Sequence, residues 1–196
     1  MVMPGEKVRI QTEKEYASYC TADVVEILER SPKRVEPVCP FFTRCGGCDW
    51  QHLPYEEQLS WKKTILENEI VRAVPYAGTV HHDPFPSPDK YGYRCHAILQ
   101  CSYTPGLTMG FYQKKSNDIV AFDHCPVLHR KIQEVVDGIR PVLSGSVQGI
   151  RSIELHAPGN DCILQVKLKD GNKNRILSIM ENMCRDLPLS GTSFID

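Results

Sequence analysis

The sequence predicts an α+β fold, in which an antiparallel sheet has helices on one face and is preceded by part of a small β-barrel. Three observations support this. Alternating segments joined by turns fill residues 91–122 and 150–168. Segments with helical apolar spacing follow each group of strands, at about 127–143 and 173–185. Strands and helices grouped in this way favour α+β over alternating βαβ units.

Composition places the chain among ordinary globular proteins. It has 196 residues, 41% hydrophobic and 24% charged, with a formal net charge of -1. No apolar run reaches the roughly 18 residues that span a bilayer, and the N-terminus lacks the apolar core of a signal peptide. We therefore expect a cytoplasmic protein with no membrane partner. Since the net charge is near zero, nucleic-acid binding would need a local basic patch.

The N-terminal region, residues 1–34, holds two predicted strands, Lys7–Gln11 and Ala22–Glu29. Two strands alone are marginal. They either dock on the rest of the chain or are the remainder of a barrel whose first strands are absent. Residues 35–74 contain a cysteine-rich loop and then a helix from Pro54 to about Val71. Its apolar residues predict packing against a core: Leu59, Trp61, Ile65, Leu66, Ile70 and Val74.

Residues 75–90 contain four prolines and read as a linker to a domain at 91–196. That domain begins with a hairpin and a third strand, at 91–103, 107–113 and 119–122, with turns at Thr104–Gly106 and Lys114–Asp118. The helix at 127–143 should bury Val135, Val136, Ile139 and Val142. Two more strands, 150–157 and 162–168, precede the last helix at 173–185.

Three cysteines lie within fourteen residues, at Cys39, Cys45 and Cys48. Only two glycines separate Cys45 from Cys48, and glycine permits the crowded backbone of a chelating turn. The best candidate for a fourth ligand is Cys125, which like Cys39 is followed directly by proline. The pattern predicts a metal centre bound by four thiolates.

Thiolate ligands favour two kinds of metal centre, zinc and iron-sulfur clusters. Three ligands on one loop with one distant ligand suit a cubane cluster better than structural zinc, whose ligands usually come in pairs from two turns. Zinc stays open as an alternative. A closed four-cysteine site indicates a structural role. We interpret His52 as a surface or second-shell residue. Nine cysteines without an export signal favour thiols, and we expect the remaining five to be small buried hydrophobes: Cys20, Cys95, Cys101, Cys162 and Cys184.

The motifs resemble, in order, those of the bacterial RNA uracil-C5-methyltransferases that modify 23S ribosomal RNA. The resemblance covers nearly the whole chain, and its motifs are Pro4–Val8, Val35–Leu53, Tyr91–Arg94, Met109–Tyr112 and Ile119–Leu128. It implies an RNA-binding TRAM barrel, a central α+β domain with a 4Fe-4S cluster, and a Rossmann-like methyltransferase domain. It also implies that the cluster ligands are Cys39, Cys45, Cys48 and Cys125.

Charge adds an inference of our own, that Arg94, Lys114 and Lys115 contact RNA phosphate. Compared with the family, we expect two parts to be absent: the opening TRAM strands and the methyltransferase domain. No cysteine matches the family's nucleophile, and no glycine-rich loop is present to hold S-adenosylmethionine. We therefore expect the front portion of such an enzyme, inactive alone and dependent on a catalytic domain supplied elsewhere, for which a separately encoded methyltransferase domain is one candidate. The alternative is a stand-alone zinc- or cluster-stabilised RNA-binding module.

Overall fold

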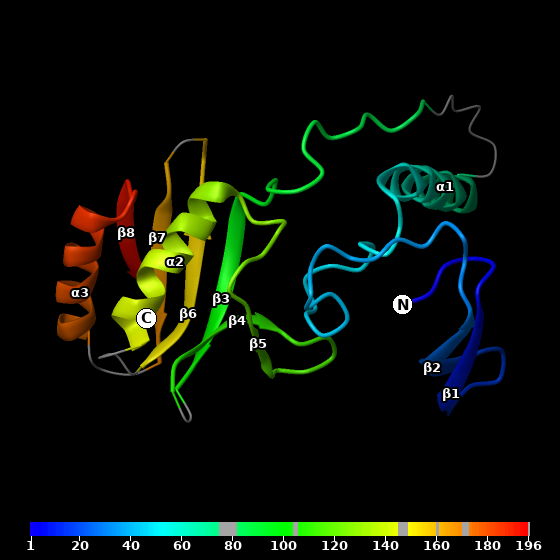
Figure 1. The fold of residues 1–196 in the computed structure, drawn as a ribbon, viewed down its shortest axis with the longest axis horizontal. Helices are drawn as coiled ribbons and strands as arrows, with labels where there is room; N and C mark the ends of the chain where they lie inside the picture. Colours follow the sequence, from blue (N-terminus) through cyan, green and yellow to red (C-terminus); the bar gives the residue numbers. More distant parts are fainter. Residues whose placement is uncertain (75–81, 104–105, 145–148, 160, 170–172, 196) are drawn as a thin grey trace. The chain divides into compact units, whose positions relative to one another are not determined.

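The computed structural model describes residues 1–74, 82–103, 106–144, 149–159, 161–169 and 173–195 (Figure 1). The chain forms two compact units. One, here called the N-terminal unit, comprises residues 1–38 and 48–87, and the other, the sheet unit, comprises residues 39–47 and 88–196. The division falls inside the cysteine loop, between Gly47 and Cys48. Part of the predicted linker, residues 75–81, lies outside the described residues.

The sheet unit contains one six-stranded sheet in the order β5-β4-β3-β6-β7-β8. Its strands are β3 (His96–Ser102), β4 (Thr108–Tyr112), β5 (Ile119–Ala121), β6 (Ile150–His156), β7 (Ile163–Leu168) and β8 (Gly191–Ile195). Neighbouring strands are antiparallel except for β7 and β8. The predicted α+β class is confirmed, but the expectation of a purely antiparallel sheet is wrong at β8. This strand was missed because it is short and follows a proline-containing connection.

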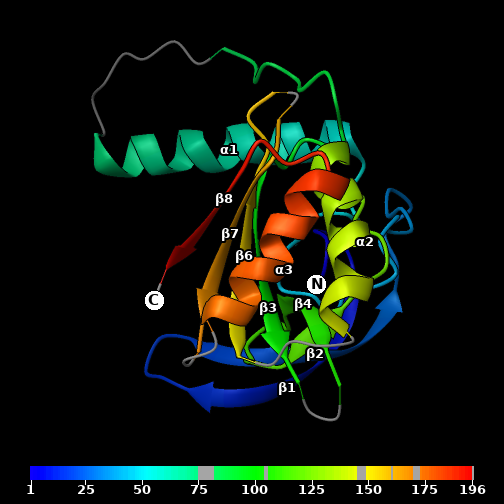
Figure 2. The same ribbon diagram turned by 90° about the vertical axis from the view of Figure 1, so that its left-hand side faces the viewer.

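Two helices, α2 (Arg130–Ser144) and α3 (Lys173–Asp186), cover one face of the sheet, as expected (Figures 1 and 2). Alternate strand residues point into this layer, which is the core of the unit. The fully buried side chains include Leu99, Ile153, Leu155 and Leu164 from the strands and Ile132, Val135, Val136, Ile139 and Ile176 from the helices. The burial of these apolar side chains is the main favourable contribution to the folding free energy of this unit.

Several element boundaries differ from the sequence prediction. The first strand of the sheet starts at His96 rather than Tyr91, and α2 starts at Arg130 rather than Val127. Val142, expected inside, is exposed. The next residue of α2, Leu143, is buried, so Val142 is exposed because it lies at the margin of the buried helix face formed by Ile132, Val136, Ile139 and Leu143. The turn residues Thr104, Pro105 and Asn160 lie outside the described part of the chain.

The N-terminal unit contains the antiparallel pair β1 (Lys7–Glu15) and β2 (Cys20–Glu29) and the helix α1 (Tyr55–Ala73). Both strands were predicted, and both are longer than expected. Almost all of their side chains are exposed, including Ile10, Val24 and Val25. The pair therefore contributes little apolar burial of its own. Within the described residues, no helix of either unit is long and apolar enough to cross a membrane.

Helix α1 forms where predicted, but the expectation that it packs into a core is wrong. None of its residues is buried, and Ile65 and Leu66 are exposed. At 3.6 residues per turn, Leu59 and Leu66 fall on one side of the helix, whereas Trp61 and Ile65 fall on nearly the opposite side. The apolar residues therefore form no single stripe that one surface can bury.

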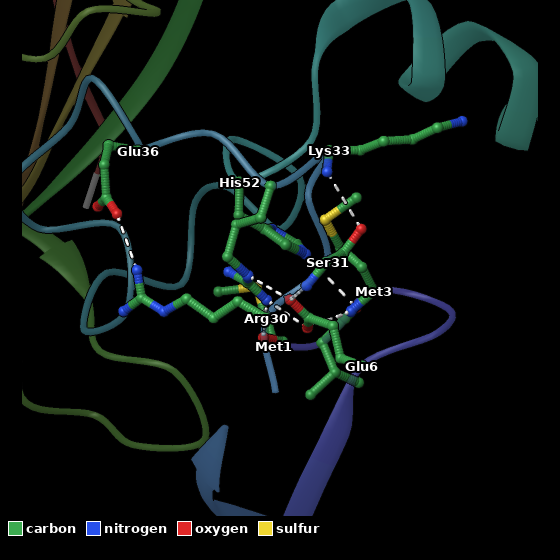
Figure 3. Close-up of polar contacts among 10 residues, drawn as sticks. Met1, Met3, Glu6, Arg30, Ser31, Lys33, Glu36 and His52 are labelled. Atoms are coloured by element: carbon green, nitrogen blue, oxygen red, sulfur yellow. Dashed lines mark hydrogen bonds and ion pairs between the residues drawn. The ribbon is translucent and has the colours of Figure 1, made fainter. Parts of the chain in front are cut away.

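A buried ion pair holds the two ends of the β1–β2 pair together (Figure 3). The Glu6 side chain is 0% exposed and accepts hydrogen bonds from Nε and Nη2 of Arg34, at 2.6 and 2.7 Å. Its two oxygens also accept the backbone N–H groups of Met3 and Ser31. The hydrogen bonds from the Arg34 guanidinium lower the Glu6 pKa to about 2, against the opposing effect of burial.

We expect a Glu6→Gln variant to lose on the order of 2 kcal/mol of unfolding free energy at pH 7, because it leaves Arg34 buried with a weaker acceptor. The folded-state pKa is depressed, so the charge contributes fully above the ordinary value of 4.5, and its contribution is lost as pH falls toward about 2. Urea unfolding of both proteins at several pH values should show their difference shrinking over that range. Glu36→Gln, at an exposed ion pair with Arg30, is the control and should change little. A constant difference from pH 7 to 2 would contradict the assignment.

Candidate functional site

The four predicted metal ligands are divided between the two units. Cys39, Cys45 and Cys125 belong to the sheet unit, and Cys48 belongs to the N-terminal unit. The three loop cysteines are half-buried, and Cys125 is only 9% exposed. Their convergence on one metal therefore stays a prediction.

The first part of the cysteine loop, Cys39–Gly47, is attached to the end of the sheet by backbone hydrogen bonds. The Gly46 N–H donates to the Tyr112 carbonyl at 2.9 Å, and the Lys114 N–H donates to the Arg44 carbonyl at 3.0 Å. A Cβ at Gly46 would lie 3.1 Å from the Tyr112 oxygen. A larger residue would therefore push the loop away from β4, and glycine permits this close approach.

Gln133, a buried residue of α2, holds the segment that contains Cys125. Its Oε1 accepts the Cys125 N–H at 3.1 Å, and its Nε2 donates to the Asp123 carbonyl at 2.9 Å and to Asp137 Oδ1 at 2.8 Å. Gln133 was not among the residues predicted for the site. A glutamine beside the apolar stripe of a predicted helix was the available signal, because buried amides are nearly always hydrogen-bonded.

Arg94 links the segment after Cys125 to the cysteine loop. Its backbone N–H donates to the Val127 carbonyl at 2.8 Å, and its carbonyl accepts the His129 N–H at 3.0 Å. Its side-chain Nη2 donates to the Gly47 carbonyl at 3.2 Å. Because the backbone of Arg94 is held by residues 127 and 129, the contact of its half-buried guanidinium with Gly47 positions the loop. Contact with RNA phosphate, predicted from its charge, remains untested.

Lys114 and Lys115 lie exposed in the turn between β4 and β5. The Gln113 N–H donates to the Asp118 carbonyl at 2.7 Å, which closes the turn, and Lys115 adopts a left-handed backbone with φ of 56°. The two lysines also line a groove of about 380 Å³, together with Gly46, Gly47, Gln100 and Tyr112. The structure thus brings two of the predicted RNA-contact residues beside the cysteine loop.

The residue types fit a soft metal centre, because thiolates select zinc or iron-sulfur clusters. Among the described residues, however, no three or more His, Cys, Asp or Glu side chains are placed to hold a single metal ion. A mononuclear zinc ion needs its ligands within about 2.0–2.3 Å of one point. A cubane has four separate irons and accepts ligands that are spread more widely.

Burial of the remaining cysteines follows the prediction only in part. Cys162 is fully buried, as expected, and burial raises its pKa. Cys101 is half-buried, and burial raises its pKa to about 12. Cys20 and Cys95 are exposed, so the interpretation as buried hydrophobes is wrong for them. The Cys184 side chain lies outside the described part of the chain.

His52 is buried, with 2% exposure, so of the two interpretations the surface residue is wrong and the second-shell residue stays a prediction. Its Nε2 lies 3.4 Å from the Val2 carbonyl, and desolvation lowers its pKa. The apolar neighbours Trp50 and Leu53 were the signal for burial, since they line the same pocket of about 270 Å³ within the N-terminal unit.

A variant of Arg94 distinguishes a role in positioning the cysteine loop from a role in binding RNA phosphate. We expect Arg94→Leu to lower the unfolding free energy by about 1–3 kcal/mol in urea titrations, because the Gly47 carbonyl loses a charged donor. Labelling of Cys45 by a thiol reagent, followed by peptide mass spectrometry, should become faster. Arg130→Leu is the matched control, since that arginine is exposed and pairs only with Glu134 among the partners seen. Unchanged stability and labelling, with weaker RNA binding, would show that Arg94 is a phosphate contact and not a positioning residue.

Comparison with known proteins reveals relatives along most of the chain, although no protein-family model matches it. The chain is 31% identical to the 23S rRNA (uracil(1939)-C(5))-methyltransferase RlmD of Photorhabdus laumondii, over 98% of this chain and 46% of that protein. The corresponding protein of Shewanella amazonensis is 34% identical, over 72% of this chain and 32% of the relative. An uncharacterized RNA methyltransferase of Aquifex aeolicus is 30% identical, over 92% and 42%.

A solved structure has a similar fold. It is the Pyrococcus abyssi tRNA (uracil-54, C5)-methyltransferase in complex with S-adenosyl-L-homocysteine, with a TM-score of 0.60 at 22% identity. The match covers 91% of this chain and 43% of that one. The chain thus spans less than half the length of the relatives that it matches. The predicted resemblance is confirmed: this chain is a homologue of part of the bacterial 23S rRNA (uracil-C5)-methyltransferases.

Proposed function

We propose that this chain is a portion of an S-adenosylmethionine-dependent RNA uracil-C5-methyltransferase, in which it holds a structural 4Fe-4S cluster and contributes to RNA binding. The observation that carries the proposal is the attachment of the cysteine loop to the sheet, with Arg94 linking that loop to the segment after Cys125. The names of the relatives, which span more than this chain does, support the enzyme class.

In this proposal the cluster ligands are Cys39, Cys45, Cys48 and Cys125. A bound cluster would supply cross-linking by iron-thiolate bonds. The chain's own residues prepare the donors: Gln133 holds the Cys125 backbone, and Arg94 holds the loop beyond Cys45. Such backbone and side-chain support of the ligands is what a rigid centre requires.

The same proposal assigns β1 and β2 to a TRAM-like segment and the sheet unit to the cluster-bearing central domain. Methyl transfer would depend on a catalytic domain with its own S-adenosylmethionine site. That domain would be encoded either together with this chain or separately from it. The substrate class is RNA, with 23S rRNA as the substrate that the relatives' names carry.

The groove beside the cysteine loop is the RNA contact that we propose. Lys114 and Lys115 would meet phosphates at one side, while the Gln100 amide and the Tyr112 ring offer hydrogen bonding and stacking to an unpaired base. This combination of positive charge and an aromatic ring in one groove is typical of sites for single-stranded RNA.

Metal analysis tests the centre. Anaerobically purified protein should contain about four irons and four sulfides per chain and absorb broadly near roughly 400 nm, as a four-cysteine cubane does. Cys125→Ser should lose most of the iron, whereas Cys95→Ser, at an exposed cysteine, should keep it. Colourless protein with about one zinc would contradict the cluster and favour the alternative, a stand-alone zinc-stabilised RNA-binding module.

RNA binding tests the groove. We expect a Lys114→Ala, Lys115→Ala double variant to bind uridine-containing single-stranded RNA several-fold more weakly. The slope of log affinity against log salt should fall by about 0.7 for each lost phosphate contact, as measured by fluorescence anisotropy. Lys167→Ala is the control, because that lysine is exposed on β7. An affinity and slope equal to those of the unaltered chain would place the RNA elsewhere.

A further inference from the structure

Two histidines lie directly opposite each other on the face of the sheet that the helices leave open. His96 of β3 and His156 of β6 are register partners. Their neighbours Ala97 and Leu155 point into the core, so the two imidazoles point away from α2 and α3. The Ala157 N–H donates to the Cys95 carbonyl at 2.8 Å. The adjacent His96–His156 pair is therefore of the non-hydrogen-bonded kind, in which facing side chains lie closest.

The two imidazole rings are spaced for a shared ion. Their centroids lie 5.8 Å apart with an interplanar angle of 72°. Two imidazoles bound to one zinc ion at about 2.0–2.1 Å, with near-tetrahedral geometry, have ring centres roughly 5 Å apart. The difference is about 1 Å, and rotation of exposed side chains supplies such a shift on a picosecond to nanosecond timescale.

Glu154 lies on β6, the strand that also carries His156, and it orients the His96 ring across the strand pair. Its Oε1 is 2.6 Å from His96 Nε2, with the two side chains 39% and 52% exposed. This contact occupies Nε2 and leaves Nδ1 as the nitrogen available to an ion. A carboxylate that holds the second ring nitrogen of a ligating histidine fixes its tautomer and raises its basicity.

We propose that His96 and His156 bind a divalent transition-metal ion of the Zn²⁺, Ni²⁺ or Cu²⁺ class, with Glu154 orienting His96. Imidazole nitrogen is a preferred ligand of these ions. Among the described residues no group of three potential ligands is placed for one ion. In the proposed site water therefore completes the coordination, and both histidines are exposed to solvent. It is chemically distinct from the thiolate centre and does not depend on the proposed function.

Zinc titration of the full chain tests the site. Histidine ring resonances, observed by NMR as ZnCl₂ is added, should shift for His96 and His156 with one common affinity. His96→Ala and His156→Ala should each weaken this binding at least tenfold, as measured from the ring resonance of the remaining histidine, because a single imidazole is a poor chelator. Glu154→Gln should weaken it less, by several-fold. All three residues are solvent-accessible, so urea unfolding should confirm that each variant folds.

His82→Ala is the matched control, because this histidine is exposed in the N-terminal unit and has no place in the site. Its zinc affinity should equal that of the unaltered chain. Zinc that leaves the His96 and His156 resonances unmoved, or His96→Ala and His156→Ala variants that bind it as tightly as the unaltered chain, would overturn the proposal. Because the cysteine thiols also bind zinc, every affinity is taken from the histidine ring resonances and not from the total zinc bound.

Discussion

The hydrogen bonds that attach the cysteine loop to the sheet are the constraint on which the candidate centre depends. The loop has no regular ladder of its own, so its backbone groups must find partners elsewhere. The Gly46 N–H donates to β4, and the Arg44 carbonyl accepts an N–H from the turn that follows β4. The Gly47 carbonyl accepts a hydrogen bond from the Arg94 guanidinium. The position of Cys45 is therefore set by the sheet, and the rigidity of the sheet comes from its packed core.

The two faces of the sheet have different roles. One face is buried under α2 and α3 and supplies most of the apolar burial of the unit. The open face and its edge carry the polar groups: the lysine groove near the cysteine loop, and the histidine pair farther along β3 and β6. A sheet stabilised from one side leaves the other side available for ligands, because the groups there are not needed for the core.

Local pattern was enough to predict most elements and the fold class. Alternation located the strands of both units, helical spacing located α1, α2 and α3, and the cysteine spacing selected the candidate ligands. Two kinds of feature escaped it. β8 is five residues long, and its parallel pairing with β7 depends on the crossover through α3. The exposure of α1, Cys20 and Cys95 depends on which surfaces meet, and hydrophobic content alone does not specify that.

The sequence by itself determined the type of chemistry available: thiols at spacings suited to a soft metal, lysines in one turn, and histidines within two strands. Only the tertiary structure decided which of these groups are neighbours. The charge of Arg94 predicts a contact with RNA phosphate, but its guanidinium donates to the Gly47 carbonyl because the backbone of residue 94 runs beside residues 127–129. His96 and His156 stand sixty residues apart in the chain and become partners through strand register. Such pairings arise from long-range packing and hydrogen bonding, which the spacing of residues along the chain does not encode.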